Sequence, residues 1–112
     1  MYIDDCTYGI DLIMHCDELI ATPINLGTSE LVSINQLVDY IEENAGVKLN
    51  RRYNLDAPRG VAGRNSDNTL IKKILNWEPN TPLKKGLNLT YHWIEQQYYA
   101  KKANKKVVTD VI

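Results

Sequence analysis

Apolar side chains recur every three or four residues in four stretches of the chain, and this spacing predicts four amphipathic helices. The first helix is expected to start at an N-cap carboxylate, Asp4 or Asp5, and to end near Cys16. Gly9 falls in the middle of this helix, where glycine costs about 1 kcal/mol relative to alanine, so we expect another segment to pack closely against it. The expected inward stripe consists of Ile10, Ile13 and Met14.

The second helix has the clearest boundaries. Ser33 and Gln36 have the spacing of a capping box, and Gly46 suits the residue after the last turn. Its apolar positions are Ile34, Leu37, Val38 and Ile41.

The last two helices also carry start signals. Asp67 or Thr69 is expected to cap a short helix that ends near Trp77, and Thr81 to cap a final helix with Pro82 in its first turn. Their expected inward residues are Leu70, Ile71, Ile74 and Leu75 in the first case and Leu83, Leu87, Tyr91, Ile94 and Tyr98 in the second.

Between the helices, three segments have strand-like patterns: residues 1–3, 23–27 and 48–55. Arg51 and Arg52 are expected to face outward from the third of these. Helices that alternate with a few short strands indicate an α/β piece. Residues 56–66 contain two glycines and a proline and are expected to form an ordered loop.

Length and composition allow one compact domain or one piece of a larger protein, because the chain has 112 residues, 44% of them hydrophobic and 24% charged. No apolar run approaches the roughly 20 residues of a membrane span, and no leader peptide is recognisable, so we expect a cytoplasmic protein without a membrane partner. Cys6 and Cys16 would lie about 15 Å apart on one helix, too far for a disulfide.

Charge is distributed unevenly along the chain. Residues 1–47 contain nine acidic residues and no lysine or arginine, whereas residues 48–112 contain all thirteen basic residues and five acidic ones. The second segment is therefore a candidate anion-binding surface. Nucleic acid is a weaker expectation, because aromatic and basic residues do not interleave on a strand face.

Arg64 is the strongest candidate for binding an anion. It follows Gly63 and precedes Asn65 and a predicted helix start, so a guanidinium would lie beside free backbone N–H groups that suit a pyrophosphate. The alternative is a surface ion pair between Arg64 and Asp67 or Asp56.

Three other motifs favour structural interpretations. Tyr98 and Lys102 have Tyr-x-x-x-Lys spacing, but they lie at the end of the final helix with no cofactor fold before them. The Gly60-x-x-Gly63 pattern lacks the helix of a dinucleotide-binding loop and indicates a flexible turn. The run at residues 15–17, His-Cys-Asp, lacks further ligands for zinc, so no metal site is expected.

Several stretches together resemble one enzyme family. They are residues 2–6 (Tyr-Ile-Asp-Asp-Cys), 25–27 (Asn-Leu-Gly), 63–68 (Gly-Arg-Asn-Ser-Asp-Asn), 75–79 (Leu-Asn-Trp-Glu-Pro) and 90–94 (Thr-Tyr-His-Trp-Ile). The chain is similar to the C-terminal, substrate-binding part of the NAD-dependent sugar-nucleotide epimerases and dehydratases, which are extended short-chain dehydrogenases/reductases. The resemblance covers residues 1–100, and residues 101–112 form a basic tail.

The resemblance implies a role in substrate binding without a chemical step. Members of the family bind NAD in an N-terminal Rossmann domain with a glycine fingerprint and a Tyr-x-x-x-Lys pair, so we expect no catalytic residue and no cofactor in this chain. Arg64, with Gly63 and Asn65, would contact the diphosphate of a nucleoside diphosphate sugar. Lysines 105–106 stand where a small hydroxyl residue is expected near the nucleotide. The missing Rossmann domain or a second copy of the chain is the expected protein partner, and a free-standing nucleotide-binding or protein-interaction module is the alternative.

Overall fold

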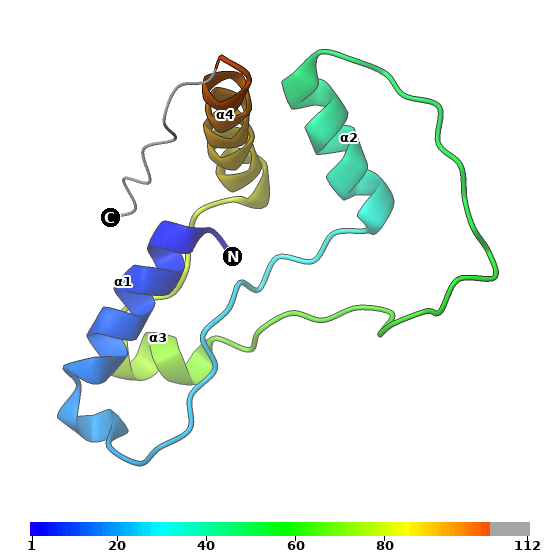
Figure 1. Cartoon of the computed structure of the whole chain (residues 1–112). Helices are drawn as coiled ribbons and strands as arrows, with labels where there is room; N and C mark the ends of the chain where they lie inside the picture. The colour runs from blue at the N-terminus through cyan, green and yellow to red at the C-terminus, as the bar shows by residue number, and fades with distance from the viewer. Residues whose placement is uncertain (104–112) are drawn as a thin grey trace.

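The computed structural model describes residues 1–103, and within them the chain is helical and contains no β-strand. The helices occur in the order α1 (Ile3–Met14), a short 3-10 helix (Asp17–Leu19), α2 (Ile34–Ala45), α3 (Thr69–Leu75) and α4 (Leu83–Lys102), as Figure 1 shows. Long irregular segments join α1 to α2 and α2 to α3.

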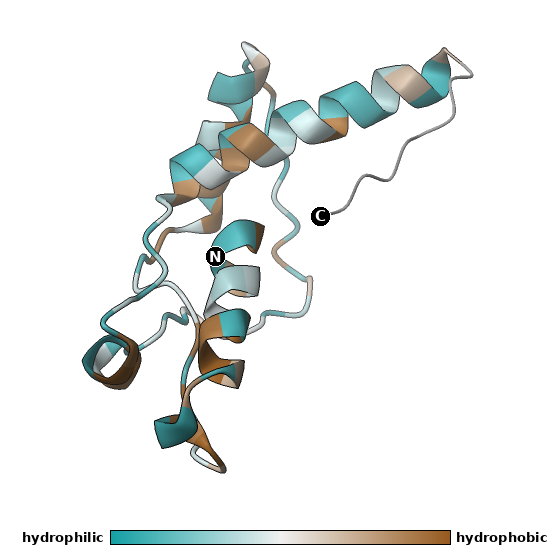
Figure 2. Ribbon diagram, turned by 90° about the vertical axis from the view of Figure 1, so that its left-hand side faces the viewer, coloured by the Kyte–Doolittle hydropathy of each residue, from teal (hydrophilic) through white to brown (hydrophobic). Residues whose placement is uncertain are grey.

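The helices form two groups. Helices α2 and α4 pack against each other, whereas α1 and α3 lie at the other end of the molecule (Figure 1). The start of α1 meets the start of α4 where the Tyr2 ring lies against Gly86; a Cβ atom at position 86 would come within 3.2 Å of this ring. The C-terminal half of α4 extends away from the other helices (Figure 2).

Gly9 is buried in α1, and the expected close neighbour is present. A Cβ atom at this position would lie 2.6 Å from Leu26 Cδ1 and 2.9 Å from Trp77 Cζ3. Tyr8 adds an edge-on contact with the Trp77 ring, at 5.4 Å between centroids. The glycine therefore lets the segment after α3 and the segment around Leu26 dock directly on the helix backbone.

Helix α2 confirms its sequence signals at both ends. The Ser33 hydroxyl accepts a hydrogen bond from the Gln36 backbone N–H, and the Gln36 side chain accepts one from the Ser33 N–H, which completes the capping box. Gly46 ends the helix in the left-handed conformation, at φ 65°.

Three helix starts differ from the sequence-based expectation. Helix α1 begins at Ile3 with Tyr2 as N-cap, so Asp4 and Asp5 lie inside the first turn and interact with the helix dipole. Helices α3 and α4 have Asn68 and Pro82 as N-caps, and neither of these residues makes a side-chain capping bond; at α3 the carboxylate of Asp67 accepts the Thr69 N–H instead. For α4 the reason is visible in the structure. The carboxylate of a distant residue accepts the free N–H group of Leu83, as described below.

The expected apolar stripe of α1 is only partly correct. Ile10 and Met14 are 47% and 77% exposed, and the buried face of the helix is the one that carries Gly9. Hydrophobic positions along α1 and the turn after it are visible in Figure 2. Cys16 lies just beyond α1, and it and Cys6 are both free thiols.

The expected strands at residues 1–3, 23–27 and 48–55 are wrong for this chain. Residue 3 already belongs to α1, and the other two segments are irregular. A strand needs a neighbouring backbone to complete its ladder of hydrogen bonds, and the described part of the chain offers these segments no regular partner. The α/β expectation is thereby corrected to a helical arrangement with long connections.

The molecule is open. Its radius of gyration is 17.9 Å, whereas a compact domain of this length has about 13 Å. Of the described large hydrophobic side chains, Leu19 and Ile71 alone are buried, and only Ile71 is fully so. The helices therefore leave most of their apolar surface uncovered.

Candidate functional site

Arg64 lies in the irregular loop at residues 56–66 and is exposed to solvent. Within residues 1–103 its guanidinium forms no hydrogen bond or ion pair. The predicted alternative, an ion pair with Asp67 or Asp56, does not occur within residues 1–103. The Asp67 carboxylate instead accepts hydrogen bonds from the backbone N–H of Thr69 at 2.9 Å and from its hydroxyl at 2.7 Å. These bonds hold the pKa of Asp67 below its ordinary value.

The two neighbours predicted to share the site are turned toward the protein. The Asn65 side-chain amide donates to the carbonyl of Ser29 at 3.1 Å, and Gly63 faces the side chain of Leu31, where a Cβ atom would make ordinary contact at 3.5 Å. The N–H group of the next residue, Ser66, donates to a backbone carbonyl at 2.9 Å. The Arg64 loop is thus fastened along the segment 27–31.

Asn68 fastens the other end of this loop. Its amide group donates to the Gly27 carbonyl at 3.0 Å and to the Glu78 carboxylate at 3.4 Å. The other oxygen of Glu78 accepts a hydrogen bond from Lys72 at 2.6 Å. The hydrogen bond from Lys72 lowers the pKa of Glu78 most, and the one from Asn68 adds to this effect. The sequence analysis did not single out Asn68. Its only signal in the sequence was that it is a polar residue directly after Asp67, the predicted helix cap.

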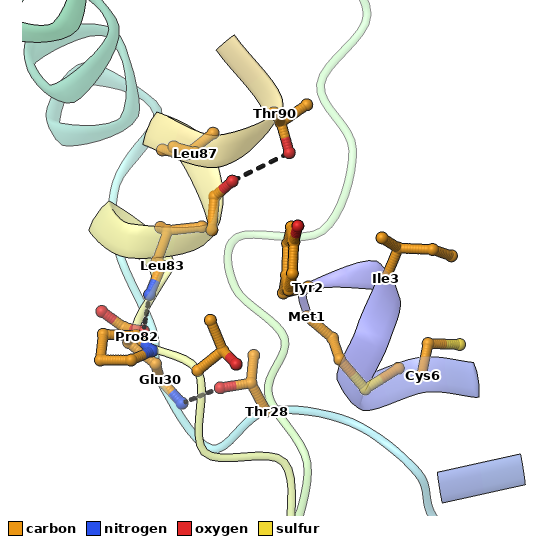
Figure 3. Close-up of a pocket in the computed structure, with 12 residues that line it drawn as sticks. Met1, Tyr2, Ile3, Cys6, Thr28, Glu30, Pro82, Leu83, Leu87 and Thr90 are labelled. Carbon is orange, nitrogen blue, oxygen red and sulfur yellow. Dashed lines mark hydrogen bonds between the residues drawn. The ribbon is translucent and has the colours of Figure 1, made fainter. Parts of the chain in front are cut away.

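A pocket of about 400 Å³ opens beside the segment 27–31, between the first turns of α1 and α4 (Figure 3). Glu30 lines this pocket, and its carboxylate accepts a hydrogen bond from the Leu83 N–H at 2.8 Å. The Glu30 N–H donates to the Thr28 hydroxyl at 3.1 Å. Tyr2 and Cys6 line the α1 side. Segment 27–31 therefore contributes to this pocket and also supports the Arg64 loop.

Arg51 was expected to face outward from a strand, and the structure corrects this. Its guanidinium binds Asp39 at 2.6 Å and Glu42 at 2.8 Å, and Lys48 binds Glu42 at 2.9 Å. Arg51 and Lys48 lower the pKa of the nearly buried Glu42 to about 2. Acidic side chains three residues apart on one face of α2 were the signal for this pairing.

The weaker motifs keep their structural interpretations. The Lys102 ammonium lies 6.0 Å from the centre of the Tyr98 ring, and both residues are at the exposed end of α4. His15 reaches only Asp11, at 3.4 Å, and no cluster of three metal-ligating side chains occurs within residues 1–103. No helix in that range is long and apolar enough to cross a membrane. Lysines 105–106 lie outside the described residues.

Comparison with known proteins supplies relatives over nearly the whole chain. GDP-mannose 3,5-epimerase of Arabidopsis thaliana is 40% identical over 102 residues, which are 91% of this chain, and GDP-mannose 3,5-epimerase 1 of Oryza sativa subsp. indica is 41% identical over 86% of it. UDP-glucuronate 4-epimerase of Thermodesulfobacterium geofontis is 34% identical over 85%. The resemblance to the sugar-nucleotide epimerase/dehydratase family is confirmed.

The match is partial on the side of the relatives. The chain spans about a quarter of the length of the curated relatives it matches: 26%, 25% and 29% for the three proteins named above. No family model matches the chain. Within the family, the motifs at residues 63–68 and 90–94 favour GDP-mannose 3,5-epimerase, and the two plant proteins agree with that interpretation.

Proposed function

We propose that this chain is the nucleotide-sugar-binding portion of an NAD-dependent sugar-nucleotide epimerase, corresponding to the C-terminal part of such an enzyme. The observation that carries the proposal is the 40% identity over 91% of the chain to a GDP-mannose 3,5-epimerase that is about four times as long. In this assignment residues 1–100 form the substrate-binding portion and residues 101–112 a basic tail.

The proposed ligand is a nucleoside diphosphate sugar, with GDP-mannose as the first candidate, and the proposed contact is Arg64 to the diphosphate. A guanidinium can donate to two phosphate oxygens at once, and such charge-assisted hydrogen bonds contribute about 1.5–3 kcal/mol each. Two features support this role: Arg64 is free of internal partners within the described chain, and Asn65 fixes the adjacent backbone. Gly63 and Asn65 complete the proposed site.

The chemical step belongs to the rest of such an enzyme in this proposal. NAD, the group that would take up and return a hydride, would be bound there, and this chain would supply substrate binding without a catalytic residue. The chain alone is therefore proposed to be inactive.

The proposed protein partner is the NAD-binding domain of the same enzyme. In the purified chain, a second copy of the chain would take the place of that domain. Exposed apolar residues on α1, such as Ile3 and Met14, support an interface of this kind. A stand-alone nucleotide-binding or interaction module is the competing assignment, and the sequence encoded upstream of Met1 distinguishes the two. A continuous frame with a glycine fingerprint supports the enzyme portion.

Nucleotide binding is tested by NMR titration of the chain with GDP, UDP and GDP-mannose. With half of a pocket, affinity is expected to be about millimolar, and the amides of residues 60–68 should shift. Arg64→Ala should abolish these shifts. Arg59→Ala is the matched control, because Arg59 is an exposed arginine of the same loop. Equal losses in both variants would overturn the proposed site, since diffuse positive charge would then account for binding.

A further inference from the structure

We infer that Asn68 is the positioning residue of the Arg64 loop: its side-chain amide fixes the register of residues 63–68 against residues 27–31 and so holds Arg64 where it can meet a phosphate. The inference rests on the proposed function of Arg64. Asn68 itself is 7% exposed and does not act as a ligand in this scheme.

The two facing segments run antiparallel without forming a regular ladder. Asn68 meets Gly27, Ser66 meets Thr28, and further along the loop Asn65 meets Ser29. Arg64 is the next residue along the loop, and its backbone is therefore held by contacts that begin at Asn68. A shift at Asn68 would move the whole series.

Burial distinguishes the contact of Asn68 from that of Asn65. The bond from Asn65 to Ser29 is exposed, so water competes for both groups and the bond opens readily. The bond from Asn68 to Gly27 is partly buried and its donor residue is buried, so breaking it would leave a buried amide N–H with less access to water. Loss of the Asn68 bond should therefore cost the loop more free energy than loss of the Asn65 bond.

The chemistry of the position requires a donor. The amide nitrogen faces two acceptors, the Gly27 carbonyl and the Glu78 carboxylate, and Lys72 occupies the other oxygen of that carboxylate. A carboxylate at position 68 would face both acceptors with no proton to donate. Asp67 cannot replace the missing donor, because an ionised carboxylate only accepts hydrogen bonds, as it does from Thr69.

The decisive variant is Asn68→Asp, which keeps the shape and removes the donor. Without ligand, at pH 7, the heteronuclear NOE values of residues 64–66 should fall, and exchange of the Ser66 amide hydrogen should accelerate by about tenfold. Below the raised pKa of the new carboxyl group, its O–H can donate to Gly27, so order should return on acidification. Asn68→Ala should lose order at both pH values.

Far-UV circular dichroism at pH 7 shows whether each variant retains its helices, and Asn68→Ala, which introduces no charge, is the variant to use if Asn68→Asp unfolds. GDP titration then separates the two proposals. Loss of response in Asn68→Asp and in Arg64→Ala, with Arg59→Ala unchanged, supports both. A normal response in a folded Asn68→Asp or Asn68→Ala variant, with the response lost in Arg64→Ala, overturns the positioning role alone. A normal response in Arg64→Ala overturns the proposed function, and the positioning role with it.

Discussion

Glu42 is nearly inaccessible to solvent, although it is a carboxylate on an amphipathic helix. Arg51 and Lys48 bind one of its oxygens, and the backbone N–H of Leu49 donates to the other at 3.1 Å. The residue therefore acts as an anchor for the segment after α2, and charged contacts replace the apolar core that this part of the molecule lacks.

The stability of this region should depend on pH through Glu42. Its pKa is lowered from 4.5 to about 2 in the folded chain, so the stabilisation is complete above about pH 4.5 and is lost as the pH falls toward 2. Urea unfolding between pH 6 and pH 2, followed by circular dichroism, measures this. The Glu42→Gln variant should show a flatter pH dependence than the wild type, and identical curves would contradict the assignment.

Gly9 is expected to be intolerant of a side chain. Gly9→Ala improves helix propensity by about 1 kcal/mol, but its methyl group would lie within 3 Å of Leu26 and Trp77, and overpacking costs about 1–3 kcal/mol. We expect net destabilisation and a perturbed Trp77 fluorescence spectrum. Gly60→Ala is the control, since a Cβ atom at position 60 meets nothing within 4 Å. A stabilised Gly9→Ala variant would show that the close contact is absent in solution.

At the scale of elements, α2 and α4 form the best defined pair. Lys84 of α4 binds Glu43 of α2 at 2.8 Å, and Asn88 donates to Asn44 at 3.1 Å. These contacts are polar and mostly exposed, so each contributes little. The capping box of α2 adds a local contribution that does not depend on these contacts.

Removing the capping box should destabilise α2 locally. Ser33→Ala eliminates the acceptor of the Gln36 N–H group and should cost about 0.5–2 kcal/mol. Faster hydrogen exchange in the first turn of α2 would report it. Ser29→Ala is the control, because Ser29 accepts the hydrogen bond from Asn65 through its backbone carbonyl, which the substitution keeps. Equal exchange rates in both variants would argue against a working cap.

At the scale of the whole molecule, the described helices bury few apolar side chains between them. The radius of gyration exceeds that of a compact domain of this length, and several apolar residues of α1 are exposed. Uncovered apolar surface favours association, so the isolated chain should dimerise or form larger species. Light scattering and binding of a hydrophobic dye test this. A strict monomer at high concentration without dye binding would contradict it.

The isolated chain should also be catalytically silent. We expect no turnover of GDP-mannose and no micromolar binding of NAD by calorimetry. Activity should appear only when an NAD-binding portion is supplied, and adding the remaining part of the Arabidopsis thaliana relative as a separate chain is a direct test. Turnover by the purified chain alone would overturn the assignment.

The sequence by itself determined the elements whose signals are local. The capping box and Gly46 define the bounds of α2, and Gly9 in the middle of α1 indicated a close neighbour. Each depends on residues within a few positions of one another, or on a missing side chain, and so is readable without the fold. The family resemblance came from contiguous motifs for the same reason.

Only the tertiary structure decided the long-range partners. Glu30 supplies the acceptor at the start of α4 from 53 residues away, and Arg51 turns inward to Glu42 instead of facing solvent. Residues 23–27 and 48–55 have the pattern of strands and remain irregular, because a strand exists only when another backbone pairs with it. Asn68 also depends on the tertiary structure. Its two acceptors, on Gly27 and Glu78, come from different segments that only the fold brings together.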